Sequence, residues 1–279
     1  FRQKCRDYAL RQVEGQRKDF VRIGVFGDWD NPYLTMDFGV EADIIRALGK
    51  IAANGHLVKG YKPVFWSVVG GSALAEAEVE YQDKTSFSID VAYSVSDTAE
   101  LVKVDSAFSG LPGDGAVNLL IWTTTPWTIP SSQAISVGAD LTYSLVQCTK
   151  NAQPMRLICS QVLLESLMDR LGISDYKVLA NCEGAALENV IARHPFYARD
   201  IPVLLGEHVT TDAGTGCVHT APDHGMEDFV VAKKYGIGTL NYIMDNGTFR
   251  DDVDLFAGEH VYKVDQHVID VLTEQSRLM

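Results

Sequence analysis

A stretch of hydroxyl-bearing residues at the end of an apolar run is the first place in this chain that could do chemistry. Residues 120–136 read LIWTTTPWTIPSSQAIS, in which a β-branched and aromatic run typical of a strand leads into Thr123, Thr124 and Thr125. Prolines follow at once and cannot donate to a strand ladder, so we expect the strand to end here with its hydroxyls exposed. The alternative is an ordinary threonine-rich strand edge.

A second stretch, residues 212–229, is a glycine-rich turn with many ionisable groups, DAGTGCVHTAPDHGMEDF. A helix is expected to begin near Gly225, which places Asp228 in its first turn. There the helix dipole favours an ionised carboxylate by about 0.3–1 kcal/mol, and such a group suits an α-ammonium ion. The alternative is that Asp228 only caps or solvates the helix, as we expect of Glu227.

Two histidines in the second stretch raise the question of a metal site. His219 and His224 stand five residues apart with a proline between them, so they do not share a helical face as HExxH ligands do. We therefore expect no metal there. His219 could act as a base, whereas His224 and Asp223 are expected to be turn residues.

The threonines allow two kinds of ester chemistry. A covalent threonine nucleophile needs an N-terminal amine or a dedicated base, so we favour attack by water on a substrate held by small polar contacts. The chain contains no G-x-S-x-G sequence that would indicate an α/β-hydrolase.

The elements that must position these groups are mostly short strands. Alternation predicts strands at 62–69, 77–81 and 89–95, further strands fit 117–123, 142–148, 155–160, 177–182 and 203–205, and more β structure is expected at 239–244 and 259–264. Helices are predicted at 1–20, 40–51, 162–171, 187–193, 226–235 and 265–278, and a Gly/Pro-rich loop at 109–115. The fold class is therefore β-rich α+β, a β-barrel core with helical decorations.

Composition limits the classes of function. The 279 residues carry a net charge of −13, although residues 1–22 hold seven basic groups against three acids, so we expect weak nucleic-acid binding by this chain alone. No apolar run suits a membrane span. Five scattered cysteines never fall in CxxC spacing, which favours a reducing, cytoplasmic location and no structural zinc.

The two motifs together resemble the editing insertion of isoleucyl-tRNA synthetases. The segments GDWDNPYLTMDF at 27–38 and SALAEAEVEY at 72–81 also match that family, so the resemblance covers nearly the whole chain. It implies a synthetic-domain junction at 1–60 and an editing domain at 61–279, with a barrel core at about 100–264. Neither HIGH nor KMSKS is present, so we expect ATP binding only in the full-length enzyme and no aminoacylation by this chain.

The resemblance also implies roles for individual residues. Asp228 would anchor the amino group of a misacylated amino acid, His219 would limit the size of its side chain, and Trp127 and Thr128 would flank the adenosine and the amino acid. Ser132 stands where the family usually has an asparagine that helps place the attacking water. Other departures are Asp223, usually glycine, and the absence of a zinc-binding CxxC pair, whose positions are held by Ser67 and Gly70.

The function expected from the resemblance is hydrolytic proofreading of valyl-tRNA(Ile), and of valyl-adenylate as a second substrate, by an aminoacyl-tRNA deacylase domain. Its partners would be the valine-carrying 3′ end of tRNA(Ile) and the remainder of the synthetase, with no cofactor, no membrane and a monomeric state. Two alternatives remain: an inactive module that binds aminoacyl-adenosine, suggested by Ser132, and a generic Thr/His/Asp esterase.

Overall fold

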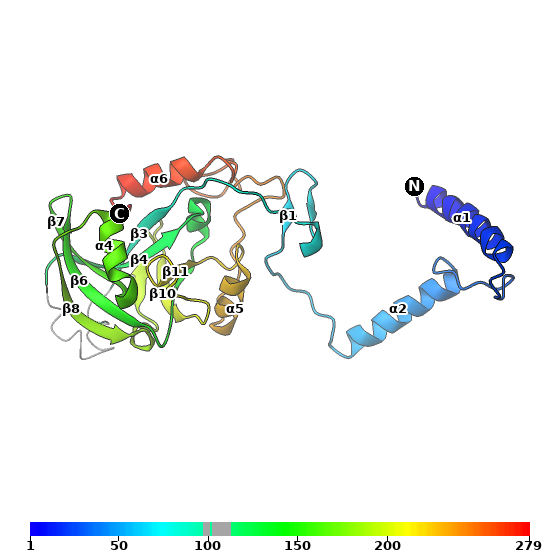
Figure 1. The fold of residues 1–279 in the computed structure, drawn as a ribbon, viewed down its shortest axis with the longest axis horizontal. Coiled ribbons are helices and arrows are strands. Elements are labelled where there is room, and N and C mark those ends of the chain that lie inside the picture. The colour runs from blue at the N-terminus through cyan, green and yellow to red at the C-terminus, as the bar shows by residue number, and fades with distance from the viewer. Residues whose placement is uncertain (97–100, 102–112) are drawn as a thin grey trace. The chain divides into compact units, whose positions relative to one another are not determined.

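The computed structural model describes residues 1–96, 101 and 113–279. The chain divides into two compact units, Phe1–Gly60 and Tyr61–Met279 (Figure 1). Part of the predicted loop at 109–115 and part of the predicted core at 100–264 lie outside the described residues. None of the described helices is both long and apolar enough to cross a membrane.

The first unit consists of two helices joined by a loop. Helix α1 (Arg2–Arg22) and helix α2 (Phe38–Ala53) lie where their sequence patterns predict them, and neither buries a residue. In the loop, the Asp28 carboxylate accepts hydrogen bonds from the main-chain N–H groups of Asp30 and Asn31 at 3.3 and 3.2 Å. The assignment of this unit to a synthetic domain stays a prediction.

The second unit is built on a five-stranded mixed sheet. Its strand order is β3-β4-β7-β6-β8, in which only β4 and β7 run parallel. The strands are β3 (Ile89–Ser94), β4 (Ala116–Thr123), β6 (Thr142–Lys150), β7 (Gln153–Ser160) and β8 (Tyr176–Glu183). All five contain predicted strands, because β3 alternates with a period of two and the other four contain apolar runs of strand length.

A smaller sheet has the order β11-β5-β10-β9. Its strands are β5 (Ala134–Val137), β9 (Ile191–Arg193), β10 (Asp200–Leu205) and β11 (Cys217–Thr220). One antiparallel bridge, Val95 to Ala192, joins β3 to β9. Among the described residues no strand pairing links β8 to β11, so the β-rich α+β class is confirmed but the strands form open sheets and not the closed barrel expected.

The main apolar core is shared by the two sheets. Leu119 and Ile121 of β4 pack with Ile135 of β5 and Val203 of β10, all fully buried. Alternate residues of β4 point to the opposite face, where Leu120 packs against Leu167 of helix α4 (Leu164–Leu171). This alternation places the last two residues of β4 on different faces of the sheet.

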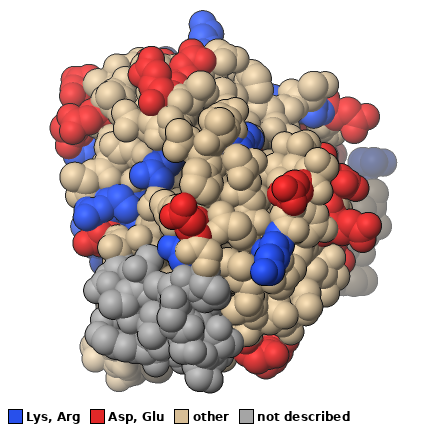
Figure 2. Space-filling model, turned by 90° about the vertical axis from the view of Figure 1, so that its left-hand side faces the viewer, with Lys and Arg blue, Asp and Glu red and all other residues tan. Residues whose placement is uncertain are grey.

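The surface on the side of α4 and β6–β8 is not dominated by charges of one sign. Figure 2 shows that basic and acidic side chains are interspersed there among uncharged residues. The expectation of weak nucleic-acid binding by the chain alone stays a prediction.

Two further helices and the last residues complete the unit. Helix α5 (Met226–Lys234) and helix α6 (Asp265–Glu274) come after the second sheet in the sequence. Figure 1 shows α6 along one side of the second unit. After α6 the chain pairs with the outer edge of β3: Ala92 N–H donates to Arg277 O and Met279 N–H to Asp90 O, both at 2.9 Å.

Several predicted elements are wrong. Residues 187–193 form no helix, because a 3₁₀ turn η5 (Gly184–Leu187) ends there and β9 pairs with β10. The segments 62–69 and 77–81 have no long partner and yield only β1 (Trp66–Ser67), β2 (Ser72–Ala73) and the 3₁₀ turn η1 (Glu76–Glu78). At 239–264 only the isolated bridges Ile243–Phe249 and Thr248–His260 form.

Candidate functional site

A cavity of about 200 Å³ opens where β4 ends beside β11 and the start of α5. It draws on both predicted motifs, which lie far apart in the sequence. Its lining residues are Trp122, Thr123, Thr125, Thr128, Val218, His219, Ala221, His224 and Asp228.

The threonines on one side of the cavity form a chain of hydroxyl groups. Pro126 opens a 3₁₀ helix, η3 (Pro126–Ser131), which turns the chain so that Thr128 comes back toward the end of β4. The Thr125 Oγ1 atom lies 3.2 Å from Thr123 Oγ1 and 3.4 Å from Thr128 Oγ1. Thr124 is exposed and is not among the lining residues.

The hydrogen bonds of Thr128 define the tautomer of His219. The hydroxyl of Thr128 donates its one proton to Thr125 O at 2.8 Å. Its 3.1 Å contact with His219 Nε2 must then have the imidazole as donor, so the Nε2–H tautomer is present. His219 Nδ1 is left as a buried acceptor without a protein partner.

Both histidines of the cavity are neutral at physiological pH. Burial lowers the pKa of His219 to about 4, and the nearby His224 lowers it further. Burial likewise lowers the pKa of His224 to about 4. His224, which the sequence predicts only as a turn residue, also lines the cavity. Its Nε2 contacts Ser131 Oγ at 3.1 Å.

Asp228 faces the threonines from the first turn of α5, as the sequence predicts. Its Oδ2 accepts the Ala221 N–H at 2.9 Å, which orients the carboxylate toward the cavity. Burial raises the pKa of Asp228, while the Ala221 N–H and the nearby His208 oppose that rise. A half-buried carboxylate of this kind gains from a cationic ligand, because a positive charge favours its ionised form.

Two other predicted residues lie outside the cavity lining. Trp127 donates its main-chain N–H to Asp265 Oδ1 at 3.1 Å, and its ring meets that of His224 edge to face at 4.8 Å. Ser132 is fully buried next to Tyr93. Burial raises the pKa of Tyr93 and the Ser132 hydroxyl opposes that rise, although the two oxygens form no hydrogen bond of normal geometry.

The remaining departures from the family pattern have structural settings of their own. Ser67 Oγ accepts the Gly70 N–H at 3.0 Å in the tight hairpin between β1 and β2. Burial raises the pKa of Asp223, which does not line the cavity. The described part of the chain contains no group of three or more His, Cys, Asp or Glu side chains that could hold a metal ion, and the absence of a cofactor stays a prediction.

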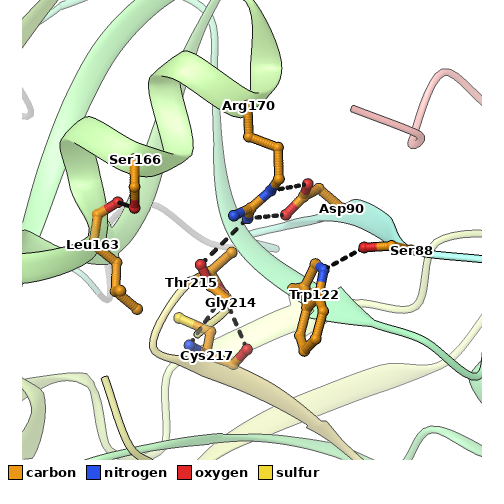
Figure 3. Close-up of polar contacts among 9 residues, drawn as sticks. All are labelled: Ser88, Asp90, Trp122, Leu163, Ser166, Arg170, Gly214, Thr215 and Cys217. Carbon is orange, nitrogen blue, oxygen red and sulfur yellow. Dashed lines mark hydrogen bonds and ion pairs between the residues drawn. The ribbon is translucent and has the colours of Figure 1, made fainter. Parts of the chain in front are cut away.

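Sequence reasoning missed Trp122, Val218 and Ala221 as lining residues. Val218 and Ala221 come from a four-residue strand and the residue after it, too short to show alternation. Trp122 also lines the cavity, and its neighbours Ser88 and Gly214 are distant in sequence (Figure 3). No local pattern marks such a contact.

The fold and the site define a class of protein. The chain belongs to the class I tRNA synthetases (I, L, M and V), whose family model matches residues 1–266. It is 63% identical over its whole length to the isoleucine–tRNA ligase of Hahella chejuensis, of which it spans 29%. It is 61% identical to that of Teredinibacter turnerae, again over the whole chain and 29% of the relative.

Solved structures confirm the fold of the second unit. GlLeuRS-CP1 matches with a TM-score of 0.55 at 18% identity, over 69% of this chain and 97% of that one. The editing domain of the P. falciparum cytosolic leucyl-tRNA synthetase matches with a TM-score of 0.53 at 12% identity, over 68% and 98%. The chain thus spans under a third of its curated relatives and has the fold of synthetase editing domains.

Proposed function

We propose that this chain is the editing part of an isoleucyl-tRNA synthetase and hydrolyses valyl-tRNA(Ile), with valyl-adenylate as a second substrate. The observation that carries the proposal is the cavity in which the Asp228 carboxylate faces the hydroxyls of Thr123, Thr125 and Thr128. One side of this cavity suits an ammonium group and the other an ester. The misacylated 3′ end of tRNA and the remainder of the synthetase are the partners that follow.

The α-ammonium group of the substrate would pair with Asp228. Oδ2 of this carboxylate is already oriented by Ala221, so the ammonium meets a fixed acceptor. Pairing at this point sets the distance from the amino acid to the threonine hydroxyls, and positioning of this kind can supply much of the rate enhancement.

Water would be the nucleophile. Hydroxyls of the threonine chain can donate to the ester carbonyl as negative charge develops on it. His219 Nδ1 is a buried atom, and the pKa of this histidine is lowered to about 4, so it is a weak base for taking a proton from the water. The described contacts give no threonine a dedicated base.

Selection would act by size. One methylene in an apolar pocket is worth about 1–3 kcal/mol, and the choice between isoleucine and valine by a synthetase of this kind is the standard example of that general limit. Because this free energy gives too little discrimination at the synthetic site, a separate hydrolytic site that admits valine and excludes isoleucine is needed to remove the wrong product. His219 is the proposed limit on one side of the cavity.

The test is deacylation of valyl-tRNA(Ile) and isoleucyl-tRNA(Ile) by this chain and by Asp228→Ala. Glu227→Ala is the matched control, because Glu227 is its exposed neighbour in the same helical turn. Cleavage of the valyl ester that is lost in Asp228→Ala and kept in Glu227→Ala supports the proposal. Binding of a non-hydrolysable valyl-adenosine analogue without cleavage of a valyl ester would instead indicate an inactive binding module.

A further inference from the structure

Trp122 lines the cavity, but the proposed chemistry gives this residue no role. It is the residue of β4 before Thr123, and it points to the α4 side of the sheet because neighbouring strand residues face opposite ways. Its half-buried ring reaches the cavity at the end of the strand. Figure 3 shows the ring between Ser88, Asp90 and Gly214.

Two contacts hold the ring directly. The indole Nε1–H donates to Ser88 Oγ at 2.8 Å. On another side lies Gly214, where an added Cβ would stand 3.3 Å from Trp122 Cε3. Gly214 has a φ of +85°, a conformation that glycine adopts without strain. Because Gly214 has no Cβ, its main chain lies closer to the Trp122 ring than a residue with a side chain would allow without a shift of the ring.

The Gly214 turn is itself held in place from α4. Arg170 donates to both carboxylate oxygens of Asp90, at 2.9 and 2.7 Å, and its Nη2 lies 3.3 Å from Gly214 O (Figure 3). The Asp90 side chain is only 7% exposed. Asp90 is also the cross-strand partner of Trp122. One ion pair thus fixes both the turn behind the ring and the strand beside it.

The other end of the turn is anchored as well. Ser160 N–H donates to Thr215 O at 2.8 Å, and the Thr215 hydroxyl donates to Cys217 O at 3.1 Å. The turn therefore cannot move away from Trp122 without breaking contacts to both β7 and β11. A bidentate guanidinium–carboxylate pair adds geometric stiffness to this arrangement.

We propose that Trp122 is a specificity-determining wall of the cavity and that Arg170 is the positioning residue that keeps it from yielding. The inference rests on the proposed function, since it concerns which side chain the same cavity admits. Two ligands that differ by one methylene are separated only if the wall does not move aside, because a wall that relaxes accepts the larger one. The two direct contacts of the ring, together with the Arg170–Asp90 pair that holds the turn and the strand beside it, meet that requirement.

The experiment measures binding, so it does not depend on turnover. Dissociation constants of non-hydrolysable valyl-adenosine and isoleucyl-adenosine analogues are compared for the unchanged chain, Trp122→Leu, Ser88→Ala and Arg170→Met. Arg193→Met is the matched control, because Arg193 forms an exposed ion pair with Asp200 at 3.2 Å. Melting temperatures show that each variant folds, and Ser88→Ala is the variant with the least disturbance to packing.

We expect the ratio of the isoleucyl to the valyl dissociation constant to fall about tenfold in Trp122→Leu, and by less in Ser88→Ala and Arg170→Met. The ratio should be unchanged in Arg193→Met. A folded set of variants that binds both analogues more weakly at a constant ratio overturns the inference and leaves the proposed function standing. An unchanged chain that binds neither analogue overturns both.

Discussion

The buried His194 should make the second unit sensitive to acid. This side chain belongs to a residue that is 2% exposed. Its Nε2 lies 2.9 Å from Ile129 O, and its Nδ1 accepts the main-chain N–H of Tyr197 at 3.1 Å and of Phe196 at 3.3 Å. Both ring nitrogens are therefore satisfied in the neutral form, and a second proton on Nδ1 would face two N–H donors.

Burial is the main reason that the pKa of His194 is lowered to about 3, with Arg199 and His219 lowering it further and the Ile129 carbonyl opposing them. In the unfolded chain the pKa of histidine is about 6.5. The unfolded state therefore binds the proton first, so the stabilising contribution of neutral His194 is complete above about pH 6.5 and is lost as the pH falls toward 3. At pH 5 the loss from this one residue is about 2 kcal/mol.

The assay is urea unfolding at pH 7.5 and at pH 5.0, followed by tryptophan fluorescence. His194→Gln should lower stability at pH 7.5, because it disturbs three hydrogen bonds, but its further loss between the two pH values should be about 2 kcal/mol smaller than that of the unchanged chain. His219 and His224 titrate in both proteins and cancel in the comparison. The control His56→Gln changes an exposed residue of the first unit. Equal losses in His194→Gln and in the unchanged chain would refute the linkage argument.

Two predictions concern the cavity. Replacing Thr128 by valine removes the hydroxyl that joins Thr125 to His219, so cleavage of the valyl ester should fall on the order of a hundredfold, whereas Thr128→Ser should retain most of it. Equal rates for the two variants in a deacylation assay would contradict this role. Incubation with a chelator should change neither the melting temperature nor the deacylation rate, because the proposed chemistry uses no metal; a fall in either would reveal a metal site.

The long strands of the fold could be predicted because each carries its own pattern. Strands β4, β6 and β7 are eight or nine residues long, and each contains an apolar run of strand length. Strand β9 has three residues, and Asn189 before it adopts a left-handed φ of 65°. Its apolar spacing therefore imitates that of a helix, and only pairing with β10 reveals the strand.

The residues of the site also fall into those that sequence could nominate and those that it could not. Asp228 and His219 belong to one compact motif, so sequence alone can nominate them, and the structure brings both to the cavity with three of the nominated threonines. The position of Ser132 in the motif nominates it as well, but its side chain points into the interior instead. Trp122 could not be nominated, because its partners Ser88 and Gly214 meet it only after the sheet has formed.

The pairing of residues 277–279 with β3 has a consequence for the order of folding. Strand β3 opens the larger sheet, and among the described residues it is the segment after α6 that pairs with its outer edge at Asp90 to Ala92. During synthesis this edge stays open until nearly the whole second unit has left the ribosome, and an open strand edge invites pairing with other chains. Contacts between such distant segments also slow folding. Pairing of residues 277–279 therefore closes this part of the edge of β3 late in the synthesis of the second unit.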